Sequence, residues 1–179
     1  MKRFLAVAVI FSLLILSACS QTNTDSEKEA KIAYSAFLKE ETDHEKSFCF
    51  KDLDQNGIDE LLLQKETKLT VYTFDGEVTE IGTQDFATAT TRFLFSDQAE
   101  YPGMFYCYVG GGKDHYGYMT IKNGALSFEE LWTENYAEYP AGSPERITAL
   151  SSDKKLIEAS KTAYEKENDL YFSSWETIE

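Results

Sequence analysis

Residues 69–81 read LTVYTFDGEVTEI, and residues 116–132 read YGYMTIKNGALSFEELW. In each stretch, apolar and polar side chains alternate on both sides of a turn sequence, Asp75-Gly76 in the first and Asn123-Gly124 in the second. Alternation with a period of two is typical of strands with one buried face, and Asp-Gly or Asn-Gly favours a two-residue turn with positive φ at both positions. The two stretches therefore predict two antiparallel hairpins.

The segments around these hairpins add further strands and two helices. Further strands are expected at residues 48–50, 61–63 and 104–109. Apolar residues at helical spacing, with Ser26 and Glu29 as a capping box, predict a helix over 27–42, and a second apolar stripe predicts one over 153–167. Between them, Ser143-Pro144 is typical of a helix start, whereas residues 146–150 fit a strand equally well. The predicted class is α+β, an antiparallel sheet of about six or seven strands with an N-terminal and a C-terminal helix.

The composition narrows the function classes. The chain has 179 residues, 17 basic against 31 acidic residues, a net charge of −14, 3 Cys and 2 His. Nucleic acid is not an expected partner because no basic face is available for its phosphates. So few Cys and His argue against a zinc ribbon or an iron–sulfur cluster.

The first nineteen residues read MKRFLAVAVIFSLLILSAC. Lys2 and Arg3 precede an apolar run that is too short to cross a bilayer comfortably but has the length of a signal-peptide core. The run ends in Leu16-Ser17-Ala18-Cys19, which resembles the lipobox of bacterial lipoproteins. The resemblance implies cleavage before Cys19, acylation of that residue, including palmitate, and anchoring at the extracytoplasmic face of the cell membrane. An uncleaved anchor or an ordinary secretory signal is the alternative.

The resemblance also divides the chain. Residues 1–18 are expected to be the signal peptide, 19–26 the lipidated Cys and a polar tether, and 27–179 a single α+β domain. Loss of Lys2 and Arg3 leaves 15 basic residues against 31 acidic ones, a net charge of −16. Such a chain is not attracted to anionic headgroups, so the acyl chains must hold it at the membrane.

Residues 50–63 read FKDLDQNGIDELLL and contain a candidate metal loop. Asp52, Asp54 and Asn56 alternate before Gly57, a pattern that supplies oxygen ligands for calcium. An EF-hand is excluded because Leu63 stands where its last Glu is required and both flanks are expected to be strands. The stretch resembles the calcium hairpins of FG-GAP and VCBS-type repeats, over about 16 residues. The resemblance implies bound calcium, and the candidate ligands are the side chains of Asp52, Asp54, Asn56 and Glu60 and the backbone carbonyl of Ile58. The ion is expected to be structural, because it would separate carboxylates that otherwise repel one another. A bare turn, capped by its own Asp and Asn side chains, is the alternative.

Other residues give weaker indications. Cys49 and Cys107 either form a disulfide or remain buried thiols. Tyr106, Tyr108, Tyr116 and Tyr118 fall on alternate positions of two strands and either expose a binding face for a glycan or protein or lie under a terminal helix. Trp132 and Trp175 are expected in the core.

No catalytic pattern is evident. Gly110-Gly111-Gly112-Lys113 lacks P-loop spacing, and His115 has no nucleophile context. The expected function is therefore a non-enzymatic cell-surface binding or interaction module. The alternatives are an envelope hydrolase that uses acids such as Glu129, Glu130 or Glu134, and an inhibitory or immunity lipoprotein.

Overall fold

The structure is a computed structural model that describes residues 25–40, 46–86, 91–96, 98–166 and 175–177. Its strands are β1 (Lys46–Lys51), β2 (Glu60–Lys65), β3 (Lys68–Phe74), β4 (Val78–Asp85), β5 (Arg92–Phe95), β6 (Met104–Gly110), β7 (Lys113–Lys122), β8 (Ala125–Asn135), β9 (Ile147–Ala149) and β10 (Glu176–Thr177). Its helical segments are a helix over residues 25–40, the 3₁₀ turn η1 (Pro144–Arg146) and α2 (Lys154–Lys166).

The strands form two antiparallel sheets instead of the single sheet expected from the sequence. The first sheet has the order β10-β1-β2-β3-β4, and the second has the order β5-β6-β7-β8-β9. Neighbours within each sheet follow one another along the chain, apart from β10, which returns to pair with β1. The antiparallel pairing and the two helices are confirmed, and the mostly stranded chain is consistent with the α+β class.

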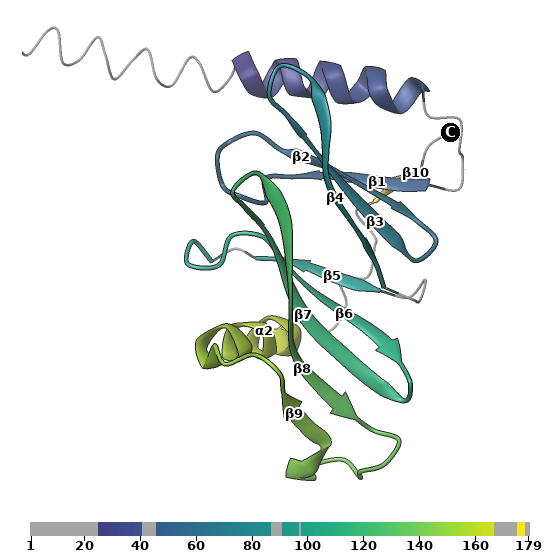
Figure 1. Cartoon of the computed structure of the whole chain (residues 1–179), viewed down its shortest axis with the longest axis vertical. Coiled ribbons are helices and arrows are strands. Elements are labelled where there is room, and N and C mark those ends of the chain that lie inside the picture. Colours follow the sequence, from purple (N-terminus) through teal and green to yellow (C-terminus); the bar gives the residue numbers. More distant parts are fainter. Residues whose placement is uncertain (1–24, 41–45, 87–90, 97, 167–174, 178–179) are drawn as a thin grey trace, which may run out of the picture.

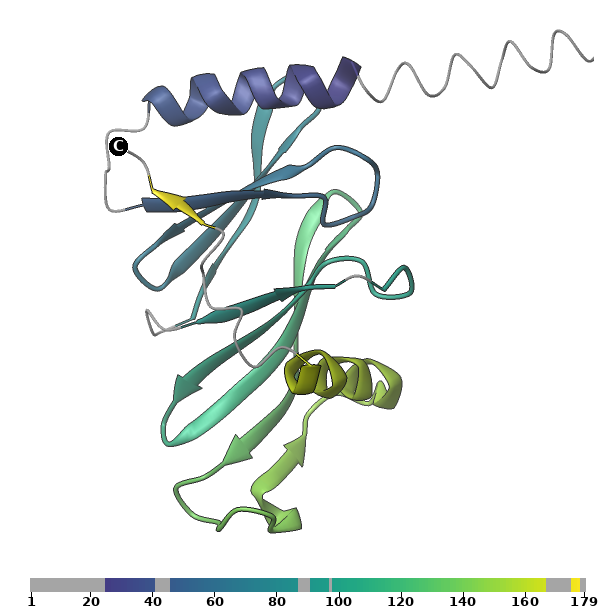
Figure 2. The ribbon, with the colours of Figure 1, turned by 180° about the vertical axis from the view of Figure 1, so that it is seen from behind.

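The molecule is built in four layers, with the two sheets between two helices (Figures 1 and 2). On the outer face of the first sheet, Ala30 and Tyr34 of the N-terminal helix pack against Leu61. On the outer face of the second sheet, Leu156 and Ile157 of α2 pack in one cluster with residues such as Phe105. Each helix therefore covers one sheet face that would otherwise expose apolar side chains.

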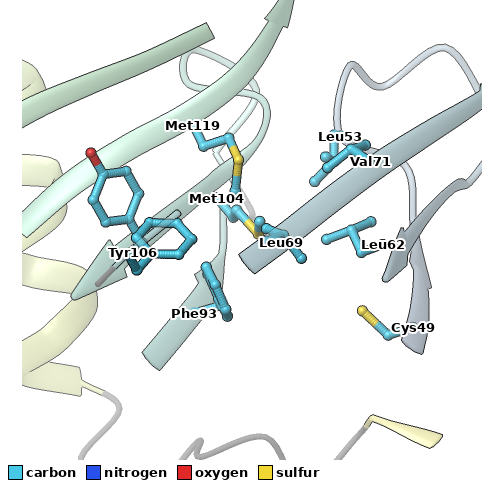
Figure 3. Packing of buried hydrophobic residues seen from close by; sticks show 10 residues of the cluster. Cys49, Leu53, Leu62, Leu69, Val71, Phe93, Met104, Tyr106 and Met119 are labelled. Carbon is cyan, nitrogen blue, oxygen red and sulfur yellow. The ribbon is translucent and has the colours of Figure 1, made fainter. Parts of the chain in front are cut away.

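The main core lies between the sheets (Figure 3). The first sheet contributes Cys49, Leu62, Leu69 and Val71, and the second contributes Phe93, Met104, Tyr106 and Met119. Strand β2 is buried on both faces, because Leu61 points to the N-terminal helix and Leu62 to the other sheet. This two-sided burial explains the uninterrupted Leu61-Leu62-Leu63 run.

The turns differ in how well they match the expectation. Asn123 and Gly124 have φ of 55° and 73° and form the expected two-residue turn between Lys122 and Ala125. At the other hairpin, Phe74 pairs with Val78 and only Gly76 has positive φ, at 80°. That connection therefore has three residues, and Asp75 does not adopt the left-handed conformation.

Both expected helices are present in the described residues. Residues 25–40 are all helical, so Ser26 lies inside the helix and not at its cap, and residues 41 and 42 of the expected helix lie outside the described residues. Helix α2 begins after Asp153, whose Oδ1 accepts the N–H groups of Lys155 and Leu156 at 3.0 Å each. Both alternatives for residues 143–150 are realised in succession, because η1 is followed directly by β9.

Candidate cation site in the β1–β2 loop

The loop of residues 52–59 connects β1 to β2, whose ends pair at Lys51 and Glu60. Leu53 is fully buried in the core between the sheets, where it anchors the loop. The flanking residues Asp52 and Asp54 remain partly exposed. The apolar residue between the two acids thus fixes where their carboxylates lie.

Hydrogen bonds within the loop shape its turn. Asp52 accepts the N–H of Asn56 on Oδ1 at 3.0 Å and that of Gly57 on Oδ2 at 2.9 Å, and Asp54 accepts the N–H of Asn56 at 3.2 Å. Asn56 Oδ1 accepts the N–H of Ile58 at 2.7 Å. Gln55 and Gly57 both have positive φ. These are the bonds that the bare-turn alternative requires, but each carboxylate oxygen retains a further lone pair for a cation.

Glu60 is the unusual residue of the loop. It opens β2, is 1% exposed, and accepts the N–H of Leu53 on Oε2 at 2.8 Å. Among the residues that the structure describes, no ion pair to Glu60 is found, and the ammonium of Lys51, its cross-strand partner, lies 5.1 Å from the ring centre of Phe95. A buried carboxylate without a cation is costly, by several kcal/mol when ionised.

The electrostatic strain appears in the carboxyl pKa values. Burial raises the pKa of Glu60 to about 8, with smaller contributions in the same direction from Asp54 and Asp52, while the bond from Leu53 opposes the shift. Burial also raises the pKa of Asp54. A cation placed among these groups would remove both the repulsion and the desolvation penalty.

The three acids have the spacing of a shared ligand set. One carboxylate oxygen from each of Asp52, Asp54 and Glu60 lies within 4.8 Å of the other two. Two oxygens bound to one calcium at about 2.4 Å are at most about 4.8 Å apart, so the arrangement fits a single ion. An all-oxygen donor set suits a hard cation such as calcium or magnesium and not zinc.

Of the five candidate ligands, the structure gathers Asp52, Asp54 and Glu60. The amide oxygen of Asn56 is engaged with the backbone of Ile58, and the Ile58 side chain packs beneath the N-terminal helix. The expectation for these last two residues stays a prediction.

The two cysteines are free and buried, and no disulfide joins them. Cys49 lies in the core between the sheets, whereas Cys107 lies on the α2 side of the second sheet, where Arg92 Nη2 donates to its Sγ at 3.2 Å. The second sheet therefore lies between the two thiols. Of the two alternatives, the structure has the buried thiols.

The four tyrosines do not form a shared face. Cys107 pairs with Tyr116 and Phe105 with Tyr118, so Tyr116 and Tyr118 face α2. Tyr106 and Tyr108 point to the opposite side, into the core between the sheets. Tyr106, Tyr116 and Tyr118 are at most 7% exposed, so the four rings do not make one exposed aromatic face. Trp132 and Trp175 pack in or against the core clusters as expected.

The acids considered for a hydrolase each have a separate partner. Glu129 accepts a hydrogen bond from Ser151, Glu130 lies 2.5 Å from Nδ1 of His115, and Glu134 lies 2.7 Å from Nε of Arg146. His115 also stacks on Tyr108, with ring centres 4.7 Å apart. Gly111 and Gly112 form the tight β6–β7 turn, with φ of 59° and 78°.

Cys19, the signal peptide and the tether up to residue 24 lie outside the described residues. Within the part of the chain that is described, no helix is long and apolar enough to cross a membrane.

No family model matches the chain, and comparison with curated proteins and with solved structures gives no match.

The sequence did not indicate which residues of the C-terminal helix lie near Glu134. Glu158, Lys161 and Glu165 lie on α2 and line a groove with Glu134. Their spacing of three and four residues places them on one helix face, and this charged stripe was the available signal.

Proposed function

We propose that this protein is a lipid-anchored, non-enzymatic binding module at the extracytoplasmic face of a bacterial cell membrane, with a β1–β2 loop held by calcium. The observation that supports the calcium site best is the buried Glu60 carboxylate, which lies within 4.8 Å of Asp52 and Asp54. Calcium would neutralise these acids and fix the hairpin that faces both the N-terminal helix and the second sheet. Its role is structural, and the ion supplies no reaction step.

Thermal unfolding of the full chain in a neutral detergent tests the calcium site. A site with a Kd of about 10⁻⁴ M would gain roughly 1.4 kcal/mol at about 1 mM calcium, which corresponds to a rise of about 3–6 °C in Tm. Magnesium at the same concentration is expected to give a smaller rise, because it prefers a compact octahedral shell and gives up water reluctantly.

Asp54→Asn is the variant that should abolish the calcium response. Asp75→Asn in the β3–β4 turn is the matched control, since Asp75 is exposed and lies in the same sheet. An unchanged Tm of the parent protein in several millimolar calcium, or an equal rise in parent and Asp54→Asn, would leave the loop as a bare turn.

The anchor is tested separately through Cys19. We expect the parent protein to fractionate with membranes and Cys19→Ser to leave them, because two or more acyl chains provide most of the holding energy. Membrane retention of Cys19→Ser would contradict the lipoprotein assignment without affecting the calcium measurement.

A further inference from the structure

An open groove of about 540 Å³ separates α2 from the outer strands of the second sheet. This volume is within the usual range of ligand sites, about 300–1,000 Å³. Its floor is aromatic: Tyr116 and Trp132 stack with ring centres 3.6 Å apart, and Tyr164 meets Tyr116 edge to face at 5.1 Å. The floor is therefore rigid and apolar.

The walls of the groove are predominantly acidic. Glu158 and Glu165 line it from α2 and Glu134 lines it from β8, whereas Lys161 is the one basic residue in the described lining. Lys161 lies 3.4 Å from Glu158, and Glu165 is exposed with no ion pair found among the described residues. Glu134 is paired with Arg146, so Glu165 on α2 carries the uncompensated charge of the described lining, and the groove favours a positively charged group beside it.

Strand β9 borders the groove and ends the second sheet. All three of its residues are exposed, and Ile147, which is 45% exposed, lines the groove. Leu150 donates its N–H to the carbonyl of Leu131 in β8 at 2.9 Å. In an antiparallel pair, backbone groups of successive residues point alternately toward and away from the neighbouring strand, so the N–H and C=O of Ala149 point away from β8. Among the described strands β9 pairs only with β8, which leaves an edge available to another chain.

We propose that the groove and the outer edge of β9 together bind an extended basic segment of a partner protein. The segment would add as a strand beside β9, and every second side chain would point toward the α2 side, as Ile147 and Glu134 do. Lysine or arginine side chains at those positions are long enough to pass over Ile147 and place their charge beside the acidic residues of α2.

An extended peptide accounts for the site better than a small organic cation. Leu150, 49% exposed, follows β9 directly, and a cation held in the groove would leave both this side chain and the strand edge uncovered. A peptide would form backbone hydrogen bonds with the strand edge, and its side chains would cover the exposed apolar side chains. The net charge of the chain, −14, also favours a basic partner.

The inference rests on the proposed role as a cell-surface binding module and names its class of partner. Figures 1 and 2 place α2 and the N-terminal helix, which follows the tether, at opposite ends of the four layers. The groove, which α2 lines, thus lies on the other side of the two sheets from the N-terminal helix. The calcium loop belongs to the other sheet, so the two sites can fail independently.

The test uses the full chain in a neutral detergent and two fluorescent capped peptides, one of alternating threonine and lysine and one of alternating threonine and glutamate. We expect the lysine peptide to bind at least roughly tenfold more tightly, and its affinity to fall at an ionic strength of about 1 M, where charges are screened beyond about 3 Å. Each titration is repeated with calcium and with chelator, so a failed calcium site is distinguished from a failed groove.

Two variants separate the parts of the site. Glu158→Gln with Glu165→Gln removes two exposed charges and should weaken the lysine peptide about fivefold or more. Ala149→Pro removes the outward N–H without touching the β8 pairing and should weaken it to a similar extent. Asp75→Asn with Glu77→Gln, an equal charge change at an exposed turn of the first sheet, should leave the affinity unchanged.

Three outcomes would overturn the proposal. They are equal binding of the two peptides, full affinity in the double glutamine variant, and full affinity in Ala149→Pro at an unchanged Tm. The third would mean that the groove holds a basic side chain without strand addition.

Discussion

Gly117 in β7 lies directly under the aromatic ring of Tyr106, its partner in β6. A Cβ added at Gly117 would be 2.1 Å from Cζ of that ring, far inside van der Waals contact. The missing side chain is therefore what allows Tyr106 to lie flat in the core between the sheets, where it is 5% exposed.

Gly117→Ala should accordingly destabilise the protein. Relief of the clash requires Tyr106 to leave its position against Phe86 and Tyr108, and overpacking of this kind costs typically 1–3 kcal/mol or more. Chemical denaturation of both proteins would measure the loss. Gly110→Ala is the control, because its nearest neighbours would be 3.6 Å or more away and its φ is not positive. Equal stabilities for the two variants would contradict the packing described.

The raised pKa of Glu60 predicts how stability depends on pH when calcium is chelated. The folded carboxyl, with a pKa of about 8, keeps its proton while the unfolded one, near 4.5, loses it. The folded state thus binds more protons between these values, and stability falls as the pH rises from about 5 to 8, by at most about 1.4 kcal/mol per pH unit.

Glu60→Gln should flatten this pH profile and abolish the calcium response together. The glutamine oxygen can still accept the N–H of Leu53, so the hairpin is expected to fold and to be more stable than the parent at pH 8 with chelator. Tm measured from pH 5 to 8, with and without calcium, checks both effects. A parallel slope in the variant would assign the pH dependence to another group.

The cap of α2 gives a third prediction. Asp153→Ala removes the acceptor of two backbone N–H groups and should cost about 1 kcal/mol, within a usual range of about 0.5–2 kcal/mol. Ser152→Ala, an exposed neighbour, serves as the control in the same denaturation experiment. A loss no larger than that of the control would mean that the cap bonds are replaced by water.

The two thiols give a fourth prediction. Burial raises the pKa of Cys49 to about 12 and also raises that of Cys107, so both groups are neutral and shielded in the folded protein. In Cys19→Ser, a maleimide at pH 8 should react slowly before unfolding and with both thiols afterward, and a reductant should leave Tm unchanged. A Tm lowered by the reductant would indicate a disulfide.

Local sequence signals identified most elements but not how they assemble. Asn123-Gly124 predicts its hairpin because Asn and Gly adopt positive φ more readily than other residues, whatever surrounds them. The division into two sheets depends on which hairpins share an edge, and alternation within a strand carries no such information. The four tyrosines show the same limit: alternation was visible, but the pairing of Cys107 with Tyr116 sets the face, and an offset of one residue reverses it.

The candidate site was more accessible to sequence reasoning. Asp52 and Asp54 are brought together by a spacing of two residues, and Glu60 by the hairpin pairing at Lys51. The burial of Leu53, which orients both aspartates, required the second sheet and was not foreseeable. The groove draws its residues from β7, β8, β9 and α2, so only the α2 stripe could be recognised locally.

The pairing of β10 with β1 has a consequence for the order of folding. Ser47 is aligned with Thr177 and Phe48 with Glu176, a contact that joins segments about 130 residues apart. During synthesis, β1 is made early, and its outer edge must wait for nearly the whole domain before its partner exists. Until then the outer edge of β1 can pair with foreign strands, so the incomplete chain is expected to be more prone to aggregation than the complete one.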